Sequence, residues 1–174
     1  PLLAIAKGVL LFLMGVMALG GIASAVAIPV LLLNQNHVTI ELAKEGIQVA
    51  TPDFVGAVSL ILVLVVALMA VLFWIFRLLK QIVDTVGAGD PFVPENASRL
   101  TRMAWLTLGV QLISLPIAAI AMWVGEVTEG ARDNEIQIDG GLDGNGLLLM
   151  LILFILARVF RKGSQMREEL EGTV

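Results

Sequence analysis

Four long hydrophobic stretches run through the chain, and polar residues gather between them. The stretches cover about residues 3–33, 54–76, 103–124 and 146–160. A bilayer core of about 30 Å requires ~20 mostly apolar helical residues, and the first three stretches meet that length. The fourth is shorter and spans the bilayer if Arg158 extends its charge toward the headgroups. The pattern therefore predicts an all-α membrane protein with four transmembrane helices.

Glycine and proline between the second and third stretches predict where these helices end. Gly87 and Gly89 are typical of the residue that terminates a helix. Asp90-Pro91 indicates a turn, and Pro94 suits the first turn of the next helix. We expect a single membrane domain over 1–174, with helices over about 3–33, 54–86, 94–125 and 146–163 and a tail over 163–174.

The basic residues are distributed unevenly among the connecting segments. Nine of the eleven lie near the start of the first helix, in the 77–102 connection or in the C-terminal tail, whereas Lys44 and Arg132 lie in the other two loops. Because segments rich in Lys and Arg stay in the cytoplasm, both termini and the 77–102 connection are predicted to be cytoplasmic. Three tryptophans lie at the predicted interfaces, where indole rings prefer to be: Trp74, Trp105 and Trp123.

The two predicted outer loops contain alternating apolar and polar residues. Val38 to Leu42 alternates, residues 43–46 supply a turn, and Ile47 to Val49 alternates again, as is typical of a hairpin. The second loop contains the similar segment NEIQIDGG. Three strands resting on a support are stable where a lone hairpin is marginal. We therefore expect a small β cap, formed by residues 38–50 and 135–138, over the outer helix ends.

Composition agrees with a membrane protein and excludes several functional classes. The chain is 58% hydrophobic and 15% charged, against about 45–50% and about 25% in globular proteins. The absence of cysteine excludes disulfides, thiol nucleophiles and cysteine metal sites. The net charge of −4 argues against direct binding of nucleic acid.

The sequence contains none of the motifs typical of an enzyme. A Ser-His-Asp set, HExxH and a P-loop are all missing, so we expect a non-enzymatic protein without cofactor or bound metal. The acidic second outer loop is interpreted as a solvated surface. The alternative is a cation sensor around DGGLDGNG, whose spacing does not match an EF-hand. His37 is likewise interpreted as a solvated loop residue, with pH sensing as the alternative.

Few polar side chains interrupt the predicted spans. Thr107, Gln111 and Ser114 lie at i, i+4 and i+7 and therefore share one helix face. They are interpreted as interhelical hydrogen-bonding groups, and the alternative is a polar ligand path beside Pro116. A band of glycine, serine and alanine in the first helix favours close helix approach, within the bundle or in a homodimer.

The segment GAGDPFVPENASRL, residues 87–100, is the candidate functional site. One interpretation is structural: Phe92 packs under the bundle and Asn96 braces the third helix. The other is a cytoplasmic docking site, because rigid turns lower the ordering cost of binding and aromatic and arginine side chains commonly anchor interfaces. The candidate partner-binding residues are Asp90, Pro91, Phe92, Asn96, Arg99 and Arg102.

Three segments carry a resemblance to a known family. They are GDPFVPENASRLTRMAW (89–105), LARVFRKGSQMREELEGTV (156–174) and an outer GIQV. With the four-span layout, they resemble small bacterial membrane proteins grouped as a domain of unknown function, often encoded beside a Cro/C1-type helix-turn-helix regulator. The resemblance implies an inner-membrane sensor or anchor that binds such a regulator, and it brings no catalytic residues. The alternatives are a small transporter, an immunity-type or lipid-binding protein, and a structural subunit of a membrane complex.

Overall fold

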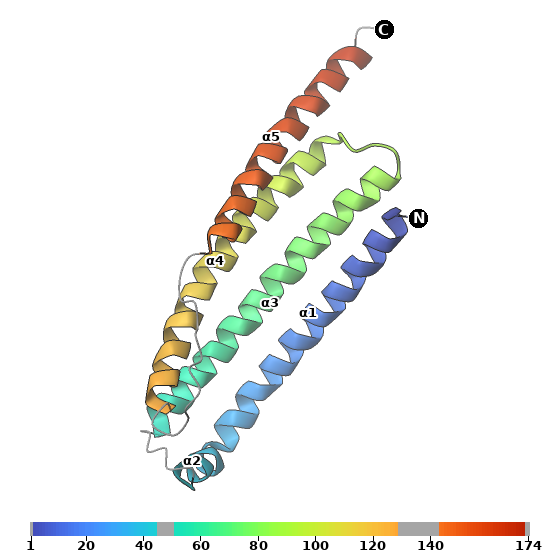
Figure 1. Cartoon of the computed structure of the whole chain (residues 1–174). Helices are drawn as coiled ribbons and strands as arrows, with labels where there is room; N and C mark the ends of the chain where they lie inside the picture. The colour runs from blue at the N-terminus through green and yellow to red at the C-terminus, as the bar shows by residue number, and fades with distance from the viewer. Residues whose placement is uncertain (1, 45–50, 129–142, 173–174) are drawn as a thin grey trace. The chain divides into compact units, whose positions relative to one another are not determined.

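The computed structural model describes residues 2–44, 51–128 and 143–172. These residues form five helices and, within the described ranges, no strand (Figure 1). The helices are α1 (Leu2–Leu33), α2 (Gln35–Lys44), α3 (Thr51–Gly87), α4 (Pro94–Thr128) and α5 (Gly144–Glu171). The predicted all-helical fold with four long apolar helices is therefore confirmed for the described part of the chain.

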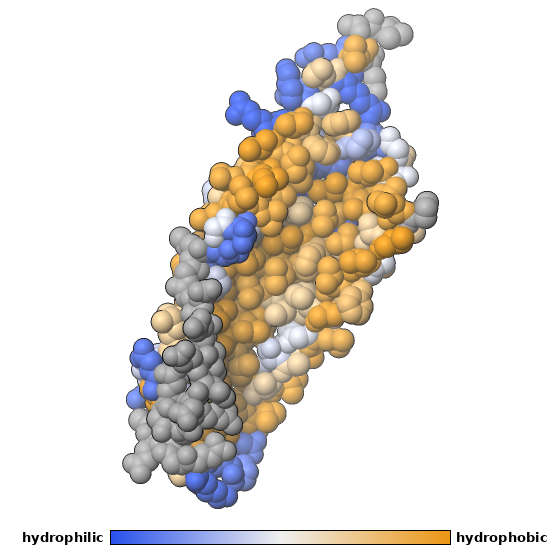
Figure 2. All heavy atoms as spheres, viewed as in Figure 1, coloured by the Kyte–Doolittle hydropathy of each residue, from blue (hydrophilic) through white to orange (hydrophobic). Residues whose placement is uncertain are grey.

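Helices α1, α3, α4 and α5 are each long and apolar enough to cross a bilayer. The mean hydropathy of their most apolar windows is between 1.8 and 3.1, yet at most 11% of any window is buried inside the protein. Large side chains such as Phe12, Leu19 and Ile155 are mostly exposed, and hydrophobic residues cover much of the visible surface (Figure 2). Exposed apolar surface on this scale is unusual for a soluble monomer, so the four helices fit a small membrane protein.

The β cap is wrong where the structure describes it. Residues 38–44 belong to helix α2, whereas residues 45–50 and 135–138 lie outside the described ranges. Val38 and Leu42 are four residues apart and half-buried together, so their spacing suits a helix as well as a strand. Local bonds then favour the helix: Thr39 donates to the carbonyl of Gln35 at 3.0 Å, and Lys44 pairs with Glu41 at 2.7 Å.

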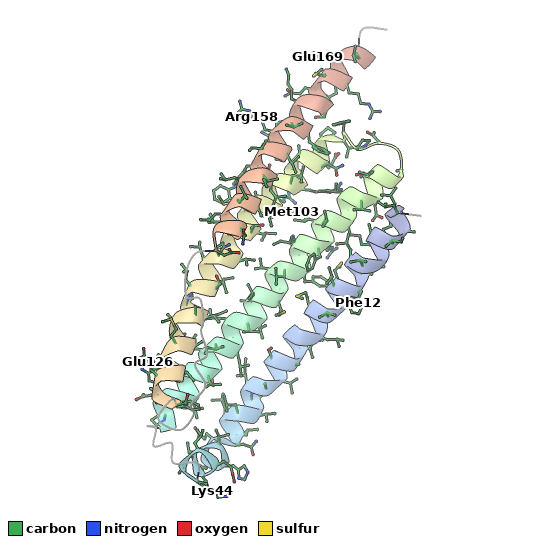
Figure 3. All side chains as sticks on the ribbon, viewed as in Figure 1. Phe12, Lys44, Met103, Glu126, Arg158 and Glu169 are labelled. Carbon is green, nitrogen blue, oxygen red and sulfur yellow. The ribbon has the colours of Figure 1, made fainter. Side chains whose placement is uncertain are left out.

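The helices form two compact units. The first comprises residues 1–17, 71–111 and 142–174, and the second comprises residues 18–70 and 112–141. Seven buried apolar side chains make the core of the first unit, with Met103 of α4 among them (Figure 3). They are Leu78, Ile82, Leu100, Met103, Ala104, Leu153 and Ala157. This unit contains the candidate site.

In the second unit, the small residues of α1 contact α3. A Cβ atom built on Gly20 or Gly21 would lie 3.6 or 3.5 Å from the side chain of Met69. These are ordinary packing distances, so part of the small-residue band serves helix packing within the chain.

Candidate functional site

The connector, defined as residues 88–93, begins with a hydrogen-bonded helix end. The amide of Asp90 donates to the carbonyl of Thr85, and the amide of Gly89 donates to the carbonyl of Val86, both at 3.1 Å. Gly89 has a φ of 86°, a conformation that residues with a Cβ rarely adopt. Helix α3 thus ends at Gly87, and the left-handed residue that reverses the chain is Gly89.

Asn96 fastens the connector to the helices on either side. Its side chain is completely buried, with 0% exposure. The Nδ2 group donates to Thr85 Oγ1 at 2.7 Å and to the carbonyl of Pro91 at 2.9 Å. The Oδ1 atom accepts from Arg99 Nη1 at 2.7 Å. One amide therefore joins α3, the connector and α4, as the bracing interpretation expects.

Helix α5 holds the connector from another side. The rings of Phe92 and Phe160 are 5.4 Å apart between centroids, and Arg167 pairs with Asp90. A Cβ atom on Gly163 would lie 2.8 Å from the Phe92 ring, so the glycine leaves room for it. Phe160, Gly163 and Arg167 are at i, i+3 and i+7 and share one helix face. Phe92 nevertheless remains 41% exposed.

A cluster of charges ties α1 to α3 in the same unit. Asp84 accepts from Lys7 Nζ at 2.7 Å and from Lys80 Nζ at 2.9 Å. All three side chains are partly exposed, and exposed pairs contribute only about 0–1 kcal/mol each. The cluster places the start of α1 beside the polar end of α3.

The structure brings five of the six candidate residues together. Asn96 is hydrogen-bonded to both Pro91 and Arg99. The other two, Asp90 and Phe92, are the chain neighbours of Pro91. Arg102 is exposed, and over the described residues it has no hydrogen bond or ion pair to this group. The contacts with Thr85, Phe160, Gly163 and Arg167 were not anticipated, because partners up to 77 residues apart leave no local pattern.

The predicted polar face divides into three different environments. Thr107 is buried and donates to the carbonyl of Met103 in its own helix at 2.9 Å. Gln111 contacts the start of α5: its Nε2 donates to the carbonyl of Asp143 at 3.2 Å, and its Oε1 accepts from the Asp143 amide at 3.3 Å. Ser114 belongs to the second unit. Gln111 alone therefore shows the expected bond between helices in the first unit.

No group of three or more His, Cys, Asp or Glu side chains is placed to hold a metal within the described ranges. His37 is exposed on α2. Most of the acidic loop, residues 129–142, lies outside those ranges, and its interpretation remains a prediction.

Comparison with known proteins gives one family match. The family described as "Protein of unknown function (DUF2975)" matches residues 37–174, which contain α3, α4, α5 and the connector. No curated protein and no solved structure matches the chain. A function must therefore be argued from the site.

Proposed function

Since this chain belongs to the DUF2975 family of proteins of unknown function, we propose a role from the geometry of its connector. The protein is a non-enzymatic sensor or anchor in a bacterial inner membrane, and its cytoplasmic end binds a small regulatory protein. A helix-turn-helix transcription regulator is the partner implied by the resemblance described above. The uneven distribution of Lys and Arg supports this orientation.

The observation that carries the proposal is a rigid surface with exposed apolar anchors. The connector is held by Asn96 from within and by α5 from outside, yet Phe92 is 41% exposed. Helix α5 continues beyond its apolar stretch, where Met166 is 52% exposed. We call Phe92 and Met166 the docking surface; Met166 lies three residues from Gly163, which contacts Phe92.

The physical argument is that binding to this surface costs little ordering. A preorganised surface avoids much of the entropy lost when flexible loops bind a partner. Exposed aromatic and methionine side chains are enriched at protein interfaces. The charged residues around them, including Asp90 and Arg167, would form the polar rim of such an interface.

A transport path along α4 has less support. Thr107 bonds within its own helix, and Gln111 is occupied by the backbone of Asp143. Both side chains thus have intramolecular partners that a polar ligand would have to displace. We therefore propose docking as the function.

Affinity capture from native membranes tests the proposal. Phe92→Ala combined with Met166→Glu is expected to reduce recovery of a bound helix-turn-helix protein at least about tenfold, because truncating an interface anchor typically costs more than 1 kcal/mol. The matched control is Gln165→Glu, which adds the same charge on the side of α5 opposite Gly163 and Arg167. It should leave capture unchanged.

Protein level and melting temperature of each variant show whether it is folded. A folded double variant that captures the regulator as well as the wild type would contradict docking at this surface. Recovery of only an integral membrane subunit would instead support a structural role and contradict the regulator assignment.

A further inference from the structure

A pocket of about 540 Å³ lies between α4 and α5 in the first unit. Six of its lining residues come from α5: Phe154, Ala157, Arg158, Arg161, Lys162 and Gln165. Thr101 of α4 lines the opposite side. Phe154, Arg158, Arg161 and Gln165 are at i, i+4, i+7 and i+11, and so share one face of α5. That face is turned away from Gly163 and Arg167, which contact the connector.

The pocket is strongly cationic. Arg158, Arg161 and Lys162 contribute three positive charges, and no acidic residue lines the pocket. Across the described part of the chain, the ion pairs formed by carboxylates involve other basic residues. Arg158 projects outward from α5 (Figure 3). Thr101 and Gln165 add neutral hydrogen-bonding groups, so the site suits an anion with several oxygen acceptors.

One wall of the pocket is aromatic and continues toward the apolar surface. Phe154 contacts Trp105 edge-on, with their ring centroids 5.6 Å apart. Trp105 is 61% exposed and lies one helical turn beyond Thr101. A ligand whose phosphate reaches the basic residues could therefore lay a hydrocarbon chain along these rings. Free phosphate would make no use of that wall.

We propose that this pocket binds the headgroup of an anionic phospholipid. The phosphate lies among Arg158, Arg161 and Lys162, and an acyl chain contacts Phe154 and Trp105. Basic pockets between transmembrane helices on the cytoplasmic side are a known class of lipid headgroup site. The proposal does not depend on the docking surface, because neither Phe92 nor Met166 lines the pocket.

Quenching of Trp105 fluorescence by brominated lipids tests the proposal. The chain has three tryptophans, so Trp74→Phe with Trp123→Phe leaves Trp105 as the sole reporter. The purified protein is titrated in neutral detergent with phosphatidylglycerol or phosphatidylcholine carrying brominated chains. Phosphatidylglycerol should quench Trp105 at a concentration lower than that of phosphatidylcholine by about tenfold or more, since each basic residue favours an anionic lipid.

The pocket variant is Arg158→Gln combined with Lys162→Gln. It should require about 30-fold more phosphatidylglycerol than the parent protein for the same quenching of Trp105. Its control, Arg77→Gln combined with Arg102→Gln, removes the same charge from residues outside the pocket. It should keep the headgroup preference.

Three results would overturn the assignment. Equal quenching of the parent protein by the two lipids would do so, whatever the variants show. A folded pocket variant that keeps the preference for phosphatidylglycerol would also overturn it. If the double variant does not fold, the same conclusion follows when both single variants keep the preference. Reversal of the quenching by inorganic phosphate at concentrations similar to those of the lipid would assign the site to small anions.

Discussion

Asn96→Leu is expected to destabilise the protein by about 2–4 kcal/mol, one of the largest effects of any single side chain. Asn96 is fully buried and makes three side-chain hydrogen bonds, to Thr85, Pro91 and Arg99. Leucine makes none of them and leaves the part-buried Pro91 carbonyl without this donor. Each broken bond costs about 0.5–1.5 kcal/mol net, and an unsatisfied buried group costs about 1–3 kcal/mol.

Thermal unfolding of the purified protein in detergent, followed by circular dichroism, measures the effect. Ser98→Ala is the control, because Ser98 is exposed two positions further along α4 and bonds only locally, to the carbonyl of Glu95. The control should melt close to the wild type. If Asn96→Leu melts at the same temperature as Ser98→Ala, Asn96 does not brace the connector.

Gly146→Ala is expected to cost about 1–3 kcal/mol, although it adds a single methyl group. The new Cβ would lie 1.5 Å from Gln111 Nε2 and 2.7 Å from its Cδ. The glutamine must therefore move, and both of its hydrogen bonds to the backbone of Asp143 are then lost. Gly109→Ala is the matched control, because nothing lies within 4 Å of the added methyl group.

A double-mutant cycle separates this mechanism from a general helix effect. Gln111→Ala removes the clashing group. The cost of Gly146→Ala should therefore be smaller in that background than in the wild type, by about 1 kcal/mol or more. Equal costs in the two backgrounds would show that the contact between α4 and α5 is not the cause.

The long helices could be predicted because a bilayer restricts the possible structures so strongly. A spanning segment must satisfy its own backbone hydrogen bonds, so an apolar stretch of sufficient length is read as a helix. The residues that end α3 and begin α4, near Gly89 and Pro94, follow from local backbone preferences. Helix α2 was missed because the alternation of Val38 to Leu42 is too short to distinguish a strand from one turn of helix.

The candidate site was predictable only where its contacts are local. Asn96 follows a proline at the start of a helix, and its bracing role was one of two interpretations of that position. The packing of Phe92 on Phe160 depends on how α5 is aligned against α4, and hydrophobic periodicity does not determine that alignment. Gly163 and Gly146 matter for the same reason: each accommodates a side chain that is distant in sequence.

The central claim is that the connector and the end of α5 face the cytoplasm, because both the regulator and the headgroup proposals place their ligands there. Labelling of single cysteines in intact bacteria with a membrane-impermeant thiol reagent tests it most directly. The parent chain has no cysteine, and Asn36 and Ala88 are both exposed. Asn36→Cys should be labelled in intact cells, and Ala88→Cys only after the membrane is permeabilised. Labelling of Ala88→Cys in intact cells, with Asn36→Cys protected, would contradict the orientation and with it both proposals.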